Sequence, residues 1–379
     1  MTQRVQLPDD RVAIAGAITS DVTATGITPR RISNAYRHQL PMEVEFLASS
    51  PSGVRLRFVT DSPTVGLELL GTHLAIGDAM YAAAIDLRAD GDLVASEQFT
   101  AGNVINVDPQ SRAMNFVPGE PITLTFDVPA GARVLELWLP NSSLVEARAL
   151  AIADGASLSA APTDVRRKWV HHGSSISHCI EAYSGSRTWP ATAAHIADVN
   201  LTNLGLAGQC HLDQFTARTI RDAPADLISL KCGINIVNGD TLRMRTFAPA
   251  LHGFLDTVRD GHPDTPLLVV SPILCPAHED APGPTDGTSG TARSVASPVA
   301  LAQGALTLTM IRGIIESVVR ARRDAGDTNL HYLDGRELFN ESDLDDLPDG
   351  LHPNGDGYIR MGERFATRAF AADGPFAAV

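Results

Sequence analysis

The residues best suited to chemistry lie in two short stretches that are far apart in the sequence. Residues 173–177 read Gly-Ser-Ser-Ile-Ser after a short apolar run, and Asp349 and His352 lie in a Gly- and Pro-containing stretch near the C-terminus. A serine hydroxyl becomes a nucleophile when a histidine takes its proton, and a carboxylate on the other ring nitrogen fixes the histidine tautomer. The stretches therefore predict a triad of Ser175, His352 and Asp349, although each stretch alone also fits an ordinary surface turn.

Two more stretches contain groups suited to binding the oxyanion of an acyl-transfer intermediate. Residues 203–208 end in Gly208, and residues 233–235 read Gly-Ile-Asn. A glycine lets the backbone approach a ligand and point an N–H at it, and an asparagine amide can donate to an oxyanion. Taken singly, a Gly-x-x-Gly is more often a turn and an Asn is more often part of an Asx turn. Together with the backbone N–H of Ser175, Gly208 and Asn235 are the candidate oxyanion hole.

The chain from residue 161 to residue 379 alternates between strand-like and helix-like segments. The strand-like segments are 168–172, 200–204, 226–231, 267–271 and 330–333, and the helix-like segments are 190–199, 211–222, 246–260, 301–323 and 356–370. This alternation predicts an α/β domain with a parallel sheet covered by helices. Open sheets of this kind bind ligands beyond the carboxyl ends of their strands, so the candidate groups are expected to meet at that edge.

The first part of the chain has a different periodicity. Apolar and polar residues alternate over 54–59, 65–69, 122–126 and 134–139, and turn-forming residues separate these runs. Many short strands with regular turns predict an all-β sandwich, similar to a jelly roll. A run of small residues at 155–162 marks the change of pattern. We therefore predict a β-sandwich domain over 1–160 and an α/β domain over 161–379.

Composition excludes several classes of protein. The chain has 379 residues, 44% hydrophobic and 20% charged, with a formal net charge of −14. The negative charge argues against nucleic acid or an anionic membrane as a partner. The N-terminus has no secretory pattern and no stretch approaches the roughly 20 apolar residues of a membrane helix, so we expect a cytoplasmic protein. The four cysteines include no C-x-x-C pair, so we expect them to pack as small hydrophobes and expect no metal site.

The four stretches, taken in order, resemble the SGNH/GDSL hydrolase family. The family is named for conserved Ser, Gly, Asn and His positions, and the resemblance covers roughly residues 165–372. It implies a three-layer, flavodoxin-like α/β domain. Two positions depart from the family pattern, because Ser174 stands where the first block has Asp, and Ile236 stands where an Asp often follows the third-block Asn.

The resemblance also implies a role for each matching residue. It makes Ser175 the nucleophile and His352 the base, oriented by Asp349. It assigns oxyanion donation to the backbone of Ser175, the backbone of Gly208 and the side chain of Asn235. Chemistry of this kind needs no cofactor, although an acyl thioester is possible as a co-substrate.

An N-terminal β-sandwich before such a domain resembles GDSL-type acyltransferases of polyketide tailoring. That resemblance implies transfer of an acyl group from a thioester to a hydroxyl of a small natural product. The triad alone does not distinguish transfer from hydrolysis, so an esterase acting on a small ester or an acylated sugar is the alternative. A carbohydrate-binding module with a degenerate catalytic site is a third interpretation, which the four intact blocks disfavour.

Two features outside the blocks complete the sequence-based expectations. Residues 276–299 are rich in Pro, Gly, Ser, Thr and Asp, which fits either a mobile lid or a disordered loop. His178 lies three residues after Ser175, on the same helix face, so it could line the site, but we expect a partly exposed helix histidine.

Overall fold

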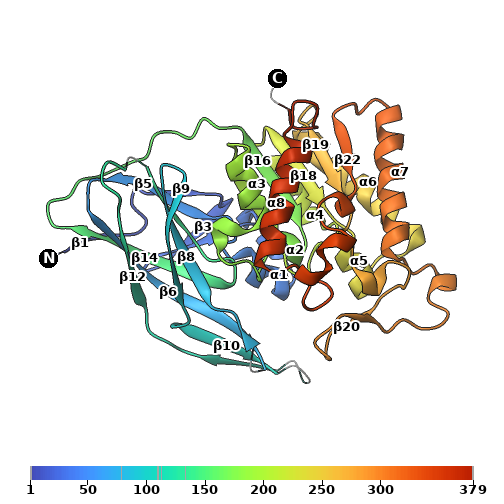
Figure 1. The fold of residues 1–379 in the computed structure, drawn as a ribbon, viewed down its shortest axis with the longest axis horizontal. Helices are drawn as coiled ribbons and strands as arrows, with labels where there is room; N and C mark the ends of the chain where they lie inside the picture. Colours follow the sequence, from blue (N-terminus) through green and yellow to red (C-terminus); the bar gives the residue numbers. More distant parts are fainter. Residues whose placement is uncertain (1, 78, 109–110, 112, 133, 378–379) are drawn as a thin grey trace. The chain divides into compact units, whose positions relative to one another are not determined.

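The computed structural model describes residues 2–77, 79–108, 111, 113–132 and 134–377. Its contacts divide the chain into two compact units, drawn in Figure 1. The first unit comprises residues 1–34, 45–165 and 180–188, and the second comprises 35–44, 166–179 and 189–379. The 3-10 turn η1 (Asn34–Gln39) and helix α1 (Met42–Ala48) lie where the chain passes between the units.

The first unit is built on two sheets whose strands pair antiparallel, except that β10 is parallel to β6. The larger sheet contains β1 (Thr2–Gln6), β3 (Thr19–Val22), β4 (Ile27–Arg30), β6 (Thr64–Ile76), β7 (Ala79–Met80), β10 (Asn103–Val107), β11 (Met114–Val117), β12 (Ile122–Asp127) and β14 (Ser143–Ala153). The smaller sheet contains β2 (Ala13–Ala15), β5 (Arg55–Thr60), β8 (Ala83–Ala89), β9 (Asp92–Phe99), β13 (Leu135–Trp138) and β15 (Leu158–Ser159). The four runs predicted as strands are confirmed as β5, β6, β12 and β13.

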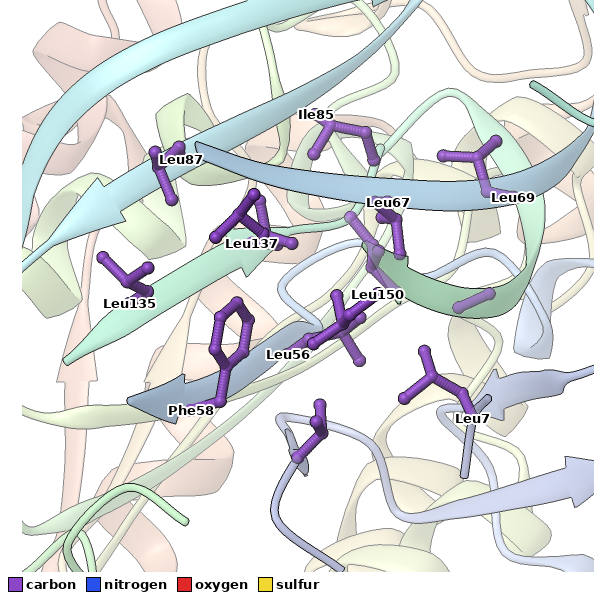
Figure 2. Close-up of a cluster of buried hydrophobic side chains, with 14 of the residues drawn as sticks. Leu7, Leu56, Phe58, Leu67, Leu69, Ile85, Leu87, Leu135, Leu137 and Leu150 are labelled. Carbon is purple, nitrogen blue, oxygen red and sulfur yellow. The ribbon is translucent and has the colours of Figure 1, made fainter. Parts of the chain in front are cut away.

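Apolar side chains from strands of both sheets form one buried cluster, shown in Figure 2. Leu56 comes from β5, Leu67 from β6, Leu87 from β8 and Leu137 from β13, and all four are fully buried. Because side chains alternate along a strand, each run of period two supplies one apolar face to this cluster. Burying each such side chain stabilises the fold by about 1.5–3 kcal/mol.

The second unit is built on a five-stranded parallel sheet, which confirms the prediction of a parallel α/β architecture. Its strands are β16 (Lys168–Gly173), β17 (Asn200–Gly205), β18 (Leu227–Lys231), β19 (Leu267–Val270) and β22 (Leu330–Leu333). Their order in the sheet is β17-β16-β18-β19-β22, so β16 lies between β17 and β18. Every residue of β19 is buried, as expected for a strand covered on both faces.

Helices cover both faces of this sheet. They are α2 (Ser175–His178), α3 (Trp189–Ile196), α4 (Gln214–Asp222), α5 (Ile234–Gly239), α6 (Met244–Gly261), α7 (Leu308–Asp324) and α8 (Gly355–Ala369), seen in Figure 1. Trp169 of β16 stacks on Phe365 of α8, whereas His172 of the same strand stacks on Phe254 of α6. Since these strand positions differ in parity, α8 and α6 lie on opposite faces.

One predicted helix needs correction, and one helix was not predicted. The segment predicted as one helix over 301–323 is a short 3-10 turn, η4 (Leu301–Gln303), followed by α7. The side chain of Thr307 accepts the N–H of Met310 and caps α7, so the longer helix begins only after this residue. Helix α5 was not predicted, because its six residues are too few to show a helical period. None of the helices in the described ranges is long and apolar enough to cross a membrane.

The buried cluster of the first unit generates a stability prediction. Leu137→Ala should lower the free energy of unfolding by about 3 kcal/mol, because it removes buried methyl groups and leaves a cavity. Leu93→Ala is the matched control, since Leu93 is 42% exposed and its loss should change stability by less than about 0.5 kcal/mol. Chemical denaturation followed by far-UV circular dichroism measures both. Equal effects of the two substitutions would contradict this description of the core.

Candidate active site

The candidate nucleophile lies where β16 turns sharply into α2. Strand β16 ends at Gly173, and Ser174 caps the helix by accepting the N–H of Ile176 at 3.3 Å. A Cβ on Gly173 would lie only 2.2 Å from Oγ of Ser177, so only glycine fits at this position. The turn therefore places Ser175 at the first position of α2, beyond the carboxyl end of a central strand.

Helix α2 has four residues and ends at Cys179, which has φ of 60°. The backbone N–H of Cys179 closes the helix by donating to the carbonyl of Ser175 at 2.7 Å. Side chains satisfy the next two carbonyls: Nε1 of Trp189 donates to Ile176 at 2.7 Å, and Nδ2 of Asn203 donates to Ser177 at 2.8 Å. An isolated helix of this length is unstable in water, so these bonds hold it in place.

A series of buried hydrogen bonds also connects α2 to strands β16 and β18. His171 lies within hydrogen-bond distance of Oγ of Ser177, at 2.8 Å from Nε2, and of Oγ of Ser229, at 2.7 Å from Nδ1. Trp169 donates its indole N–H to Ser229 at 2.8 Å. Burial is the largest of the effects that lower the pKa of His171 well below its usual value, so the ring is neutral and carries one N–H. If the Ser229 hydroxyl donates to Nδ1, the N–H of the ring is on Nε2 and donates to Oγ of Ser177.

The structure brings Ser175, His352 and Asp349 together as a hydrogen-bonded chain. Nε2 of His352 lies 2.9 Å from Oγ of Ser175, and Nδ1 lies 2.7 Å from Oδ2 of Asp349. A carboxylate only accepts, so Nδ1 carries the proton of a neutral ring and Nε2 is left to accept from the serine. This is the tautomer that a general base requires.

Local bonds fix the loop that carries Asp349 and His352. Oδ1 of Asp349 accepts the backbone N–H of His352 at 2.6 Å, so the carboxylate binds both the ring and the main chain of one residue. Immediately afterwards, Asn354 caps α8 by accepting the N–H of Gly357 at 2.9 Å. The loop is thus attached at the start of a long helix, which limits the movement of the imidazole.

The carboxyl group of Asp349 is ionised at any working pH. Its partial burial raises the pKa, but the hydrogen bond and charge of His352, with the backbone N–H groups of His352 and Leu351, lower the pKa to about 2 overall. A permanently charged acceptor stabilises the imidazolium that forms when the base takes a proton.

The candidate oxyanion donors follow the two strands that flank β16, the strand that precedes the candidate nucleophile. Gly208 follows β17, Asn235 follows β18, and Ser175 follows β16 between them. Gly208 has φ of 70°, and a Cβ there would meet no atom within 4 Å, so its backbone borders open space. The parallel register brings all three groups to one edge of the sheet.

A direct hydrogen bond joins the two oxyanion loops. The backbone N–H of Cys210 donates to Oδ1 of Asn235 at 3.0 Å. This bond uses the oxygen of the amide and leaves its NH₂ group for a ligand. The loop of Gly208 is in turn tied to the nucleophile, since Leu206 donates to the carbonyl of Gly173 at 2.9 Å and Ala207 donates to Nδ1 of His178 at 3.4 Å.

The expectation for His178 was wrong. Its side chain is buried, because α2 points it at the loop after β17, where it accepts the N–H of Ala207. The packing role expected for the cysteines is confirmed for all four, which are buried and free of disulfides. Burial raises the pKa of both Cys232 and Cys275 to about 12, so these groups remain thiols.

Sequence reasoning missed the residues that hold the nucleophile helix. Neither Trp189 nor His171 belongs to one of the four blocks, and the partners of their polar atoms are brought to them only by the fold. The two departures from the family pattern are also explained locally. Ser174 caps α2 in place of the family's Asp, and Ile236 is fully buried within α5.

Comparison with known proteins identifies the class of this second unit. Residues 172–360 match the model of the GDSL-like Lipase/Acylhydrolase family, and this part of the chain belongs to that family. The protein is accordingly an enzyme of the GDSL acyl hydrolase and acyltransferase type.

Solved structures resemble the chain along almost its whole length. The salicylyl-acyltransferase SsfX3 from a tetracycline biosynthetic pathway is 27% identical, with a TM-score of 0.79 over 96% of this chain and 95% of that one. A family two carbohydrate esterase from Clostridium thermocellum, solved with cellohexaose, is 13% identical, with a TM-score of 0.61 over 94% and 97% of the two chains. The corresponding enzyme from Cellvibrio japonicus is 12% identical, with a TM-score of 0.58 over 97% and 96%. The two esterases share the fold alone, and no curated protein sequence matches the chain.

The geometry of the three-residue chain predicts the effect of one substitution. Asp349→Asn keeps the shape of the side chain but removes the charge and allows the amide to stabilise the wrong tautomer of His352. We expect kcat to fall by about 10³–10⁴-fold with little change in KM, as for the equivalent change in a Ser-His-Asp triad. Steady-state hydrolysis of an activated aryl ester measures this. A variant that retains more than a tenth of the activity would show that Asp349 does not orient the base.

Proposed function

We propose that this enzyme is an acyltransferase that moves an acyl group from a thioester to a hydroxyl of a small natural product. Ser175 is the proposed nucleophile, His352 the general base and Asp349 its orienting carboxylate. The observation that carries the serine acyl-enzyme chemistry is the continuous chain of hydrogen bonds from Ser175 through His352 to Asp349, at 2.9 and 2.7 Å, within a GDSL-family domain. The choice of transfer over hydrolysis rests on similarity to the salicylyl-acyltransferase.

In the first half-reaction, Oγ of Ser175 attacks the carbonyl carbon of the donor while Nε2 of His352 takes the hydroxyl proton. The new C–O bond makes a tetrahedral oxyanion. Its collapse breaks the C–S bond, and His352 returns the proton to the departing thiolate. The products are an acyl ester on Ser175 and a free thiol.

The proposed oxyanion hole consists of the backbone N–H groups of Ser175 and Gly208 and the side-chain amide of Asn235. The amide is supported in this role by Cys210, whose N–H binds Oδ1 and so leaves the NH₂ group as the donor. Removing one donor of such a hole typically costs about 10²–10³-fold in kcat.

In the second half-reaction, Nε2 of His352 takes the proton of an acceptor hydroxyl, whose oxygen attacks the acyl ester. Collapse breaks the bond to Oγ of Ser175, and His352 returns the proton to that oxygen. Similarity to the salicylyl-acyltransferase supports an alcohol as the acceptor, because it extends over 96% of the chain at 27% identity. The alternative is an esterase, in which water takes the place of the alcohol. The carbohydrate esterases share this two-part fold and give that alternative its support, with an acylated sugar as the substrate.

We further propose that residues 1–160 form a β-sandwich, similar to a jelly roll or a carbohydrate-binding module, and that 161–379 form a three-layer, flavodoxin-like catalytic domain. The single apolar cluster shared by strands of two sheets supports the sandwich. The helices on both faces of the parallel sheet support the three layers. The reaction requires no cofactor, and the acyl thioester is a co-substrate.

Product analysis distinguishes transfer from hydrolysis. The enzyme is incubated with acyl-thioester donors, with and without hydroxylated acceptors, and the products are separated by liquid chromatography and mass spectrometry. We expect an acylated acceptor, formed faster than free acid, and neither product from a Ser175→Ala variant. Free acid as the only product, whatever acceptor is offered, would contradict the acyltransferase and favour the esterase.

A further inference from the structure

Residues 276–299, which by sequence fit a lid or a disordered loop, adopt a defined path in the structure. The segment starts with the 3-10 turn η3 (Pro276–His278) and forms a hairpin of β20 (Thr285–Asp286) and β21 (Arg293–Ser294). Thr285 pairs with Ser294 and Asp286 with Arg293 in antiparallel register. The hairpin lies within the second unit, so its contacts with the candidate site can be described directly.

A buried histidine anchors the base of the hairpin. His278 is fully buried, and its Nδ1 lies 3.1 Å from the carbonyl oxygen of Ala281. A carbonyl only accepts, so Nδ1 donates, and Nε2 of the neutral ring accepts from the hydroxyl of Thr285 at 2.7 Å. Burial lowers the pKa of His278, which favours this neutral form.

The same hydroxyl attaches the first strand of the hairpin to the helix that carries an oxyanion donor. Oγ1 of Thr285 also lies 3.0 Å from Oδ1 of Asn238, which is in α5 three residues after Asn235, so its single proton is shared between this oxygen and Nε2 of His278. Gly283 packs so closely against the same helix that a Cβ there would collide with the carbonyl oxygen of Val237. Thr285 is thus the polar connection between the hairpin and α5.

The other strand of the hairpin is attached to the loop that carries the candidate base. Just before β21, the backbone N–H of Ala292 donates to the carbonyl of Asp349 at 2.8 Å. Within the hairpin, Ser294 donates its hydroxyl to the carbonyl of Pro282 at 2.6 Å, and Val295 donates its N–H to Pro284 at 2.9 Å. One hairpin therefore connects the helix of Asn235 with the loop of Asp349.

We propose that segment 276–299 is a fixed wall of the active site and that Thr285 is the positioning residue that locks it to α5. The wall holds the helix of the oxyanion donor and the loop of the base at a constant separation, and it does not open as a lid during turnover. The inference rests on the proposed function only for the roles of Asn235, Asp349 and His352.

Trypsin cleavage after Arg293 tests whether the wall is fixed. The side chain of Arg293 is 61% exposed but paired with Asp286 across the hairpin, so its cleavage depends on whether β21 can unfold locally and release it. We expect the wild type to be cut there no faster than it unfolds globally. Thr285→Val, which keeps the shape and removes the hydroxyl, should be cut roughly tenfold faster, as expected for the loss of about one buried hydrogen bond.

Two matched variants control for the substitution itself. Thr288→Val makes the same chemical change in the same hairpin, where the hydroxyl donates to Oδ1 of Asp286 at 2.7 Å. Arg293 is bonded to the other oxygen, Oδ2, so this variant keeps that ion pair and its cleavage should match the wild type. Thr285→Ser keeps the hydroxyl and should restore protection. With an aryl ester, Thr285→Val should raise KM several-fold while the amplitude of Ser175 acylation stays unchanged.

Rapid cleavage of the wild type at Arg293 would overturn the proposal without any variant. Equal cleavage rates and KM values for Thr285→Val and Thr288→Val would also overturn it. Cleavage is measured on the free protein and so does not depend on the reaction. If Ser175 of the wild type is not acylated at all, that result contradicts the proposed function. The cleavage result would still test the fixed wall.

Discussion

The active site depends on holding a helix of four residues at the end of a strand. Helix α2 positions Ser175, but it is too short to be stable alone and it ends at once in a left-handed residue, Cys179. Its carbonyl groups are buried, and a buried polar group without a partner costs about 1–3 kcal/mol. Trp189 and Asn203 supply those partners from neighbouring elements. The position of the nucleophile is therefore a property of the whole α/β unit.

The arrangement of the other groups follows from the strand order. Because β16 lies between β17 and β18, the loops that carry Gly208 and Asn235 flank Ser175, and the bond from Cys210 to Asn235 joins them. The candidate base, His352, lies in a separate loop just before α8. Asp349, three residues earlier in the same loop, accepts the hydrogen bond of its ring. The site thus combines a candidate nucleophile and candidate oxyanion donors fixed by the sheet with a proposed base fixed by a helix cap.

The sequence predicts the features that local patterns encode and misses those that depend on distant contacts. Period-two runs predict β5, β6, β12 and β13, and the three-residue spacing of Asp349 and His352 predicts their contact. The burial of His178 could not be predicted, because its partner Ala207 is 29 positions away on another strand's loop. Composition likewise describes 276–299 as a loop, whereas the contacts that order it come from α5 and from Asp349.

Ser175 is the only serine of the Gly173–Ser177 turn that should act as a nucleophile, and covalent labelling can show this directly. A fluorophosphonate reacts with an activated serine, and peptide mapping by mass spectrometry then identifies the modified residue. We expect one adduct per chain, on Ser175. Ser174 should stay unmodified because its hydroxyl oxygen caps α2, and Ser177 because its hydroxyl is bonded to His171. An adduct on either of those serines, or normal labelling of a Ser175→Ala variant, would contradict it.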